Sequence, residues 1–388
     1  MNAVAERQRA DAHIDTSASE LAGLRVLLVH EWLYTWAGAE RVLEQLVALM
    51  PHADVLAGIV TPAMRREHTL AARARESWAG KLPGAHAHHR WFLPAHALAF
   101  ATHDTSGYDL VVSVSHAFEK AIRPRKPGAV HVSYCLSPPR YLWDLSDEHD
   151  QLANPLQRAA LRIARAPLRS LDRRFARRVD HFVALSRHVS ERVKRAYGRD
   201  SAVVYPPVSA KGTNAVPPAR RDFLFTMGRL VPYKRVDLAI EAAESLGLRL
   251  VIAGDGPERA RLERLAGPRT EFLGAVSEQE AGRQLSSCSA FVFCAADDFG
   301  IAPLEANAHG APVVAYGAGG ALETIQDGVT GVFFREQTAA AVAEAVRRCQ
   351  ATSWDENALR SNAASFSPER FREGMREQIA AAMKQHRE

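Results

Sequence analysis

The stretch "AFVFCAADDFGIAPLEANAHGAPVVAYG", Ala290–Gly317, contains the pattern that decides the fold. An apolar run at Ala290–Ala295 is followed by a turn that contains two acidic residues and a glycine. A helix is expected next, with Pro303 in its first turn and its end near Gly310, and a second apolar run follows at Ala311–Gly317. Short, continuously apolar runs that alternate with helices are typical of the buried parallel strands of doubly wound α/β domains.

The same alternation occurs on both sides of a Pro-rich, polar stretch at Pro206–Asp222, which we interpret as a linker. A chain of 388 residues also exceeds what one hydrophobic core usually supports. We therefore expect an α/β protein of two doubly wound, Rossmann-like domains that face each other across a cleft. The predicted parts are a flexible tail (1–23), an N-terminal domain (24–208), a C-terminal domain (209–367) and a C-terminal helix (368–388) that packs back on the N-terminal domain.

The composition is that of a soluble enzyme, with 47% hydrophobic and 24% charged residues. The formal net charge of +5 favours an anionic ligand or an anionic membrane surface, but the basic motifs interleaved with aromatic residues that a nucleic-acid module needs are missing. The first residues lack the apolar core of a signal peptide, and the four cysteines form no Cys-x-x-Cys pair. We expect a cytoplasmic protein with reduced thiols.

One segment, Arg158–Arg178, holds eight arginines and a single aspartate. It is interpreted either as a solvated helix face that is broken at Pro167, or as a site of peripheral contact with the cytoplasmic face of the inner membrane. The second interpretation follows because each basic residue near an anionic membrane contributes about 1 kcal/mol.

Two strand-to-helix turns carry features that suit phosphate binding. Gly38 precedes a helix predicted to begin near Ala39 or Glu40, where unpaired amides and the helix dipole attract anions. In the second half, Arg229 and Lys234 follow a strand and would clamp a diphosphate. Each turn taken alone also fits an ordinary glycine connection or a solvated basic loop.

The turn within Ala290–Gly317 adds acceptors for hydroxyl groups. Asp297 and Asp298 lie where the strand ends, beside Gly300, and Glu305 is expected in the first turn of the helix. Backbone amides would receive phosphate oxygens, while carboxylates would accept hydrogen bonds from sugar or ribose hydroxyls. A ligand that is both an anion and a polyol, such as a nucleotide sugar, has all of these groups.

Taken together, these and further motifs of the sequence resemble those of the retaining glycosyltransferases of family 4, which have the GT-B fold. The resemblance covers nearly all the chain after residue 24 and rests on "GRLVPYKRVDLAIEA", "DDFGIAPLEANAHGAPVVAYGAGGALETI" and "DGVTGVFF" in the second half. In the first half, "HEWLYTWAGAERVLE", "SVSHAFEKAIR", "SYCLSPPRYLWD" and "RRVDHFVALSRHVSERVKRAYG" look most like the mannosyltransferases of bacterial O-antigen and exopolysaccharide assembly.

The resemblance implies roles for individual residues. The first domain would bind the acceptor, with Gly38 near the donor diphosphate and His116 near the transferred sugar, and the second would bind the nucleotide sugar. The residues implied in catalysis are Arg229, Lys234, Asp297 and His116, and those implied in donor binding are Gly38, Arg229, Lys234, Asp297, Phe299, Gly300, Ile301, Ala302 and Glu305.

The sequence departs from the family at several positions. Asp297 stands where the family has a glutamate that is separated by seven residues from the one that binds ribose, and is one methylene shorter. Ala37 replaces a second glycine, and Leu136 and Ala318 replace a histidine and an arginine of the subgroup. These departures bear on the sugar that the site selects.

The activity that the resemblance implies is transfer of mannose from GDP-mannose, with retention, to a hydroxyl of a glycan or lipid-linked glycan in cell-surface polysaccharide synthesis. No cofactor and no metal are expected; "HAHH" (His86–His89) and "DEHD" (Asp147–Asp150) are interpreted as solvated loops. The alternatives are a UDP-sugar donor, a non-catalytic nucleotide-sugar-binding subunit, and a dinucleotide-dependent oxidoreductase. The last rests on "GDGPER" and "GAGGAL", which fail to complete the glycine fingerprint at Arg259 and Leu322.

Overall fold

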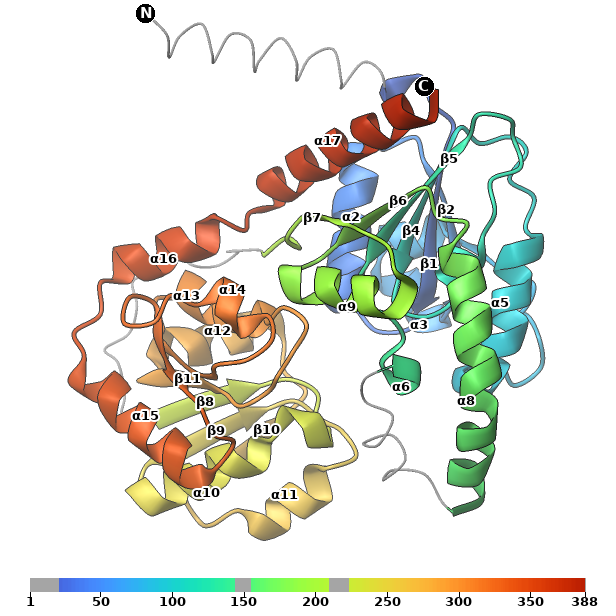
Figure 1. Cartoon of the computed structure of the whole chain (residues 1–388). Coiled ribbons are helices and arrows are strands. Elements are labelled where there is room, and N and C mark those ends of the chain that lie inside the picture. The colour runs from blue at the N-terminus through green and yellow to red at the C-terminus, as the bar shows by residue number, and fades with distance from the viewer. Residues whose placement is uncertain (1–20, 144–154, 209–222, 388) are drawn as a thin grey trace, which may run out of the picture. The chain divides into compact units, whose positions relative to one another are not determined.

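The computed structural model describes residues 21–143, 155–208 and 223–387 of the chain (Figure 1). The chain divides into two compact units, one formed by residues 1–207 with 368–388 and the other by residues 208–367. The predicted tail at 1–23 and linker at Pro206–Asp222 fall mostly outside the described residues, as does "DEHD".

The first unit is built on a seven-stranded sheet in the order β3-β2-β1-β4-β5-β6-β7, and every pair of neighbouring strands is parallel. Its central strands are continuously apolar and buried, as the sequence predicts for a sheet covered on both faces. The strands are β1 (Val26–Leu33), β2 (Asp54–Val60), β3 (Arg75–Glu76), β4 (Leu110–Ser115), β5 (Val130–Cys135), β6 (His181–Ala184) and β7 (Ala202–Val203).

Helices connect these strands and cover the sheet. The α-helices are α2 (Gly38–Leu49), α3 (Pro62–Glu67), α4 (Thr69–Arg73), α5 (Leu93–Thr102), α6 (Arg140–Trp143), α8 (Pro155–Ala176), α9 (Arg187–Tyr197) and α17 (Pro368–Arg387). Two short 3-10 helices, η1 (His89–Phe92) and η2 (Glu119–Ala121), lie in the connections on either side of β4.

Helix α8 corrects one prediction, because it continues through Pro167 instead of breaking there. Two arginines of this helix also contact other parts of the protein while they remain at least partly exposed. The guanidinium groups of Arg169 and Arg173 lie 5.2 and 4.8 Å from the ring centroid of Trp143. Their Nε atoms donate to the carbonyl oxygens of Leu142 and Ala196, at 2.6 and 3.0 Å. Packing of these side chains, and not solvation alone, therefore accounts for two of the eight arginines.

The C-terminal helix α17 belongs to the first unit. Its residue Phe371 is fully buried and meets the ring of Tyr134 on β5 edge to face, at 5.5 Å between centroids. Arg372 donates a hydrogen bond to the side chain of Gln45 on α2. The twenty-residue helix thus returns to the sheet formed by the first part of the chain.

The second unit has a six-stranded parallel sheet in the order β10-β9-β8-β11-β12-β13. Alternate residues of β9 enter two separate hydrophobic cores, with Leu250 and Ile252 in one and Val251 in the other, so helices cover both faces. The strands are β8 (Phe223–Met227), β9 (Arg249–Ala253), β10 (Thr270–Gly274), β11 (Ala290–Phe293), β12 (Val313–Tyr316) and β13 (Gly331–Phe334). The helices are η3 (Pro232–Lys234), α10 (Val236–Leu246), α11 (Arg259–Leu265), α12 (Glu278–Ser287), α13 (Ile301–Ala308), α14 (Ala321–Thr324), α15 (Ala339–Ala351) and α16 (Glu356–Ala364).

Two further expectations can be compared with the fold. The four cysteines, at positions 135, 288, 294 and 349, are all buried, and none of them forms a disulfide. Within the described residues, no helix combines the length and the apolar character that crossing a membrane requires.

Candidate functional site

The turn between β11 and α13 contains a glycine with positive φ directly before the helix. Gly300 is the N-cap of α13 and has a φ of 89°, which favours glycine. Helical geometry leaves the first amide groups of α13, beginning with Ile301 and Ala302, without acceptors inside the helix. Phe299 is buried and its ring packs on Phe366, so its side chain anchors the turn.

Glu305 does not lie where the sequence predicted. Because α13 begins at Ile301, Glu305 is its fifth residue and belongs to the second turn, and the first turn contains no acidic residue. Its side chain is half-buried. The N-terminal amides of α13 are therefore not neutralised by an acid of the same turn, which favours an external anion there.

Lys234 and Asp297 form an ion pair, although the sequence analysis gave them separate roles. The Nζ of Lys234, at the end of η3, lies 2.6 Å from Oδ2 of Asp297, and the two side chains are 19% and 20% exposed. The other carboxylate oxygen of Asp297 accepts the backbone N–H of Asp298 at 3.1 Å. Lys234 also lies 5.4 Å from the centroid of the Phe293 ring. The pair joins the basic loop after β8 to the acidic turn after β11.

A second loop, between β12 and α14, packs against the turn that contains Asp297. The backbone N–H of Gly320 donates to the carbonyl oxygen of Asp297 at 2.8 Å. A Cβ on Gly320 would lie 2.2 Å from Cα of Phe299, and a Cβ on Gly319 would lie 2.4 Å from the Asp297 carbonyl oxygen. Gly319 and Gly320 of "GAGGAL" thus let two loops of the protein approach each other, which accounts for these two glycines without a dinucleotide.

The loop after β8 is held in the same way. Cβ atoms on Gly254 and Gly256, the glycines of "GDGPER", would lie 1.9 and 2.3 Å from the carbonyl oxygens of Gly228 and Leu230. Leu230 also donates its N–H to the carbonyl of Asp255 at 2.9 Å. Arg229 is exposed on this loop and, with Lys234, lines a small pocket. The two cations predicted to clamp a diphosphate therefore border the same hollow.

In the first unit, Gly38 is the first residue of α2, one residue earlier than expected. The carboxylate of Glu40 accepts the N–H of Ala37 at 2.9 Å and lies 3.1 Å from Nε2 of His30. Burial opposes ionisation, but the contact with His30 outweighs it and lowers the pKa of Glu40. The Glu40 carboxylate therefore already occupies part of the N-terminal end of α2.

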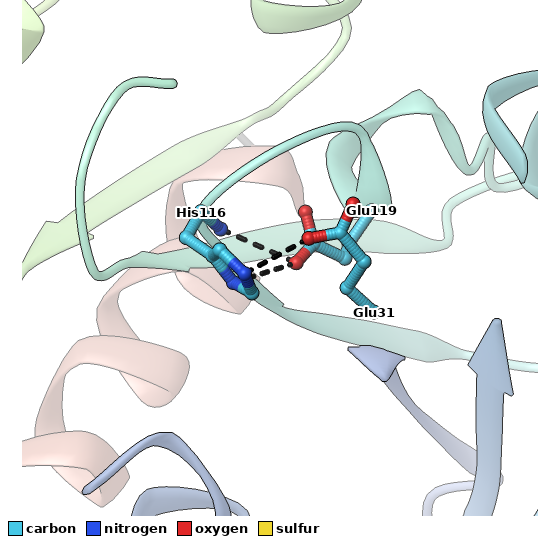
Figure 2. A group of neighbouring side chains, drawn as sticks. All are labelled: Glu31, His116 and Glu119. Atoms are coloured by element: carbon cyan, nitrogen blue, oxygen red, sulfur yellow. Dashed lines mark hydrogen bonds and ion pairs between the residues drawn. The ribbon is translucent and has the colours of Figure 1, made fainter. Parts of the chain in front are cut away.

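His116, just after β4, lies beside two buried glutamates, as Figure 2 shows. Its Nε2 lies 2.9 Å from Oε2 of Glu31 on β1, and its Nδ1 lies 3.2 Å from Oε1 of Glu119 on η2. The histidine side chain is 39% exposed, whereas the glutamates are 1% and 0% exposed. Strands β1 and β4 are neighbours, so their carboxyl ends bring these residues together.

The cluster shifts the pKa of each of its members. Burial raises the pKa of Glu31 to about 7, with a further contribution from Glu119. Burial opposes charge on His116, but the two carboxylates outweigh it and raise the pKa of the imidazole well above its ordinary value. Burial also acts on Glu119, but contacts with His116 and backbone N–H groups lower its pKa to about 2.

Among the described residues, one group of acids and histidines is spaced closely enough for a metal ion, and it is Glu31, His116 and Glu119. Glu119 already accepts hydrogen bonds from Ser115 Oγ and the N–H groups of His116 and Ala117, at 3.2, 3.2 and 2.9 Å. We therefore treat the group as a salt-bridged cluster. In "HAHH", His86 pairs with Glu76 at 2.7 Å.

Glu31 and Glu119 were missed by the sequence analysis. Both acids lie in stretches that carry the family resemblance, Glu31 in "HEWLYTWAGAERVLE" and Glu119 in "SVSHAFEKAIR", but neither was given a role. Only the pairing of β1 with β4 brings Glu31 to His116. Glu119 follows His116 by three residues, and this spacing was a local signal of their contact.

Comparison with known proteins places the second unit in a family. Residues 214–366 match the model for glycosyl transferases group 1. This range contains Arg229, Lys234, Asp297 and Glu305, and it covers nearly the whole second unit.

Curated relatives match over limited lengths. A GDP-mannose-dependent alpha-(1-6)-phosphatidylinositol monomannoside mannosyltransferase of Mycobacterium tuberculosis is 30% identical over 209 residues, which is 46% of this chain and 54% of the relative. A GDP-mannose-dependent alpha-mannosyltransferase of the same organism is 40% identical over 107 residues, 27% of this chain and 28% of the relative. The match thus spans about a quarter to about half the length of these relatives.

Solved structures extend the comparison to the whole fold. Anabaena HepE, in complex with UDP and glucose, superposes with a TM-score of 0.69 at 16% identity, over 92% of this chain and 99% of that one. At this identity the likeness establishes the architecture alone. The chain therefore has the GT-B fold, and its residues 214–366 match the family model for glycosyl transferases group 1.

Proposed function

We propose that the protein is a retaining glycosyltransferase of family 4 that transfers mannose from GDP-mannose to a hydroxyl of a glycan or lipid-linked glycan in cell-surface polysaccharide synthesis. The observation that carries the proposal is the Lys234–Asp297 ion pair, whose acid lies three residues before Gly300, the N-cap of α13. The mannosyltransferase relatives support the choice of donor.

The second unit would hold the donor. Arg229 and Lys234 would neutralise the diphosphate, and the three donors of the Lys234 ammonium allow it to keep Asp297 while binding phosphate. Asp297 would accept a hydroxyl of the sugar and Glu305 a ribose hydroxyl. The remaining contacts would come from the backbone amides of Phe299, Gly300, Ile301 and Ala302.

In the reaction, the bond between C1 of the sugar and the diphosphate oxygen breaks, and a bond from C1 to the acceptor oxygen forms on the same face. The acceptor proton passes to the departing phosphate. The protein then contributes charge stabilisation and positioning, with Gly38 and His116 acting from the first unit. No cofactor takes part in this scheme.

The donor assignment is tested by calorimetric titration of the protein with GDP-mannose, GDP-fucose, UDP-glucose and UDP-N-acetylglucosamine. GDP-mannose is expected to bind most tightly and to release GDP when a glycan acceptor is added. Tighter binding of a UDP-sugar would show that the donor is a UDP-sugar and not GDP-mannose. Binding without turnover over a panel of mannosylated acceptors would favour a non-catalytic subunit. Tightly bound NAD would favour the oxidoreductase.

A peripheral contact with the cytoplasmic face of the inner membrane is proposed for α8. Arg165, Arg169, Arg173 and Arg177 line a shallow hollow on this helix, and Ile163 is 79% exposed beside it. Co-sedimentation with vesicles containing phosphatidylglycerol tests this proposal. Binding is expected to weaken at high salt and on Arg177→Glu, while Arg261→Glu on α11 of the second unit should have no effect. Equal binding by both variants would exclude α8.

A further inference from the structure

Both nitrogens of the His116 ring face carboxylates, and this arrangement restricts the protonation state of the ring. Nε2 lies 2.9 Å from Glu31 and Nδ1 lies 3.2 Å from Glu119 (Figure 2). A neutral imidazole has one N–H and one lone pair, so one of the two carboxylates would face a lone pair. Nδ1 of His116 and both carboxylate oxygens of Glu31 have no hydrogen-bond partner among the described residues, so the contacts are ionic, and only the positively charged imidazolium is attracted to both carboxylates.

The two glutamates differ in what else supports them. Glu119 is held by Ser115 Oγ and two backbone N–H groups, so its charge and position are largely fixed by its own loop. Glu31 lies on β1, is 1% exposed, and its carboxylate contacts the other nitrogen of the ring. The Glu31 carboxylate is therefore less constrained by other contacts than that of Glu119, and a change at Glu31 should have the greater effect on how the ring is held.

Neighbouring charged groups do not replace this contact. Lys120 pairs with Asp172, with 2.7 Å between Nζ and Oδ1, and His30 pairs with Glu40. Tyr141 on α6 also lies close enough to sense Glu31 and Glu119, and burial holds its pKa well above the ordinary value, so it stays neutral. The groups that set the charge of His116 are thus the two glutamates that touch it.

We propose that Glu31 is a positioning residue that fixes the orientation of the His116 ring and keeps it protonated, so that His116 serves the reaction as a fixed cation and not as a proton acceptor. The role of the ring in transfer rests on the proposed function, whereas its protonation state does not. A permanently charged His116 has no lone pair with which to deprotonate an acceptor hydroxyl, which fits a reaction in which the departing phosphate takes that proton.

The protonation state is measured by NMR of the histidine side chains between pH 5.5 and 10, with the His116 signal assigned by its loss in His116→Gln. In the wild-type protein the ring should remain an imidazolium at pH 7.5. In Glu31→Gln the pKa of His116 should fall by at least about one unit, because one of its two carboxylates is lost. Glu31→Asp, which keeps the charge but shortens the side chain, should give an intermediate value and serves if Glu31→Gln fails to fold.

A matched control is Glu76→Gln, which removes another Glu–His pair of the first unit, that of Glu76 and His86. It should leave the His116 titration unchanged. A neutral His116 at pH 7.5 in the wild type, or the same His116 pKa in all variants, would overturn the proposal. So would binding of one Zn²⁺ or Mn²⁺ per chain that moves the His116 signals and is lost in Glu31→Gln, since the cluster would then hold a metal in place of the proton.

The activity readout is the pH dependence of kcat for mannose transfer. In Glu31→Gln the decline of kcat at high pH should move to lower pH by the same interval as the His116 pKa, while KM for GDP-mannose changes little. Glu76→Gln should show the wild-type profile, and an unshifted profile in Glu31→Gln would contradict a positioning role. If no transfer is found with any donor, the proposed function fails, but the NMR result still decides whether Glu31 holds His116 protonated.

Discussion

Lys234 and Asp297 lie 2.6 Å apart, Nζ to Oδ2, although 63 residues separate them in the chain. One follows β8 and the other follows β11, and these two strands are neighbours in the sheet of the second unit. The carboxyl ends of adjacent parallel strands thus bring a cation and an acid together where a ligand of an open α/β sheet binds. Removal of either side chain would therefore leave the charge of the other without its partner.

Lys234→Ala is expected to abolish most transfer while the protein stays folded. A cation aimed at a leaving diphosphate contributes to the transition state, and loss of such a group lowers kcat by about 100-fold or more. The side chains are about one-fifth exposed, so the stability lost with the ion pair should be about 1 kcal/mol or less. The measurements are GDP release and the Tm from circular dichroism.

The control for this variant is Arg249→Ala, which removes the cation of the exposed Arg249–Glu271 pair in the same unit. It should keep wild-type turnover. Wild-type turnover in Lys234→Ala would contradict the diphosphate clamp.

Two replacements of Asp297 distinguish the effect of its charge from the effect of its side-chain length. Asp297→Asn keeps the size of the side chain but leaves Lys234 without its carboxylate, and we expect kcat/KM for GDP-mannose to fall about tenfold or more, since a charge-assisted hydrogen bond is worth about 1.5–3 kcal/mol. Asp297→Glu keeps the charge and restores the family's side-chain length. It should retain transfer and change the ratio of kcat/KM between GDP-mannose and GDP-fucose. An unchanged ratio would show that the shorter acid does not select the sugar.

The sequence predicted the architecture well because buried parallel strands leave a local signal. Continuous apolar runs, such as those around Val29 and Val292, identified the central strands of both units. The Gly300 turn was also predictable, because a positive φ at a helix start favours glycine. These are properties of short segments, and they need no knowledge of distant contacts.

What the sequence could not predict depends on contacts between distant segments or on the exact start of a helix. Glu305 was placed in the first turn of a helix whose first residue, Ile301, could not be located to within two residues. Pro167 was expected to break a helix that packing around Trp143 maintains. The contact of Glu31 with His116 depends on the register between β1 and β4, which no local pattern specifies.

Gly320→Ala tests whether the loop behind the Asp297 turn shapes the donor site. The new methyl group would lie 2.2 Å from Cα of Phe299, and backbone must move to admit it. Such overpacking costs about 1–3 kcal/mol, so we expect a lower Tm and weaker binding of GDP-mannose, although Gly320 itself is not proposed to touch the ligand. Calorimetric titration measures the affinity.

Gly317→Ala is the matched control on the same segment. Its Cβ would meet Phe333 at 3.4 Å, an ordinary contact, and Gly317 has no positive φ. Donor affinity should therefore stay close to that of the wild type. If Gly320→Ala also binds GDP-mannose normally, the turn around Asp297 does not depend on this support.

The glutamates that flank His116 should affect stability with opposite dependence on pH. Glu119 has a folded-state pKa of about 2 against an ordinary 4.5, so it stabilises the first unit above pH 4.5 and this contribution is lost as the pH falls toward 2. Glu119→Gln should therefore be less stable than the wild type by about 3 kcal/mol at pH 7, and the difference should shrink below pH 4.5.

Glu31 has a folded-state pKa of about 7, so burial of its charge lowers wild-type stability as the pH rises from 4.5 to 7. Relative to the wild type, Glu31→Gln should thus gain stability over that interval, whereas Glu119→Gln should not. Urea unfolding followed by tryptophan fluorescence measures both, because five of the six tryptophans lie in the first unit and only Trp354 lies in the second. If the stability of the two variants changed with pH in the same way, the pKa values of Glu31 and Glu119 would not be shifted in opposite directions, and this prediction would be wrong.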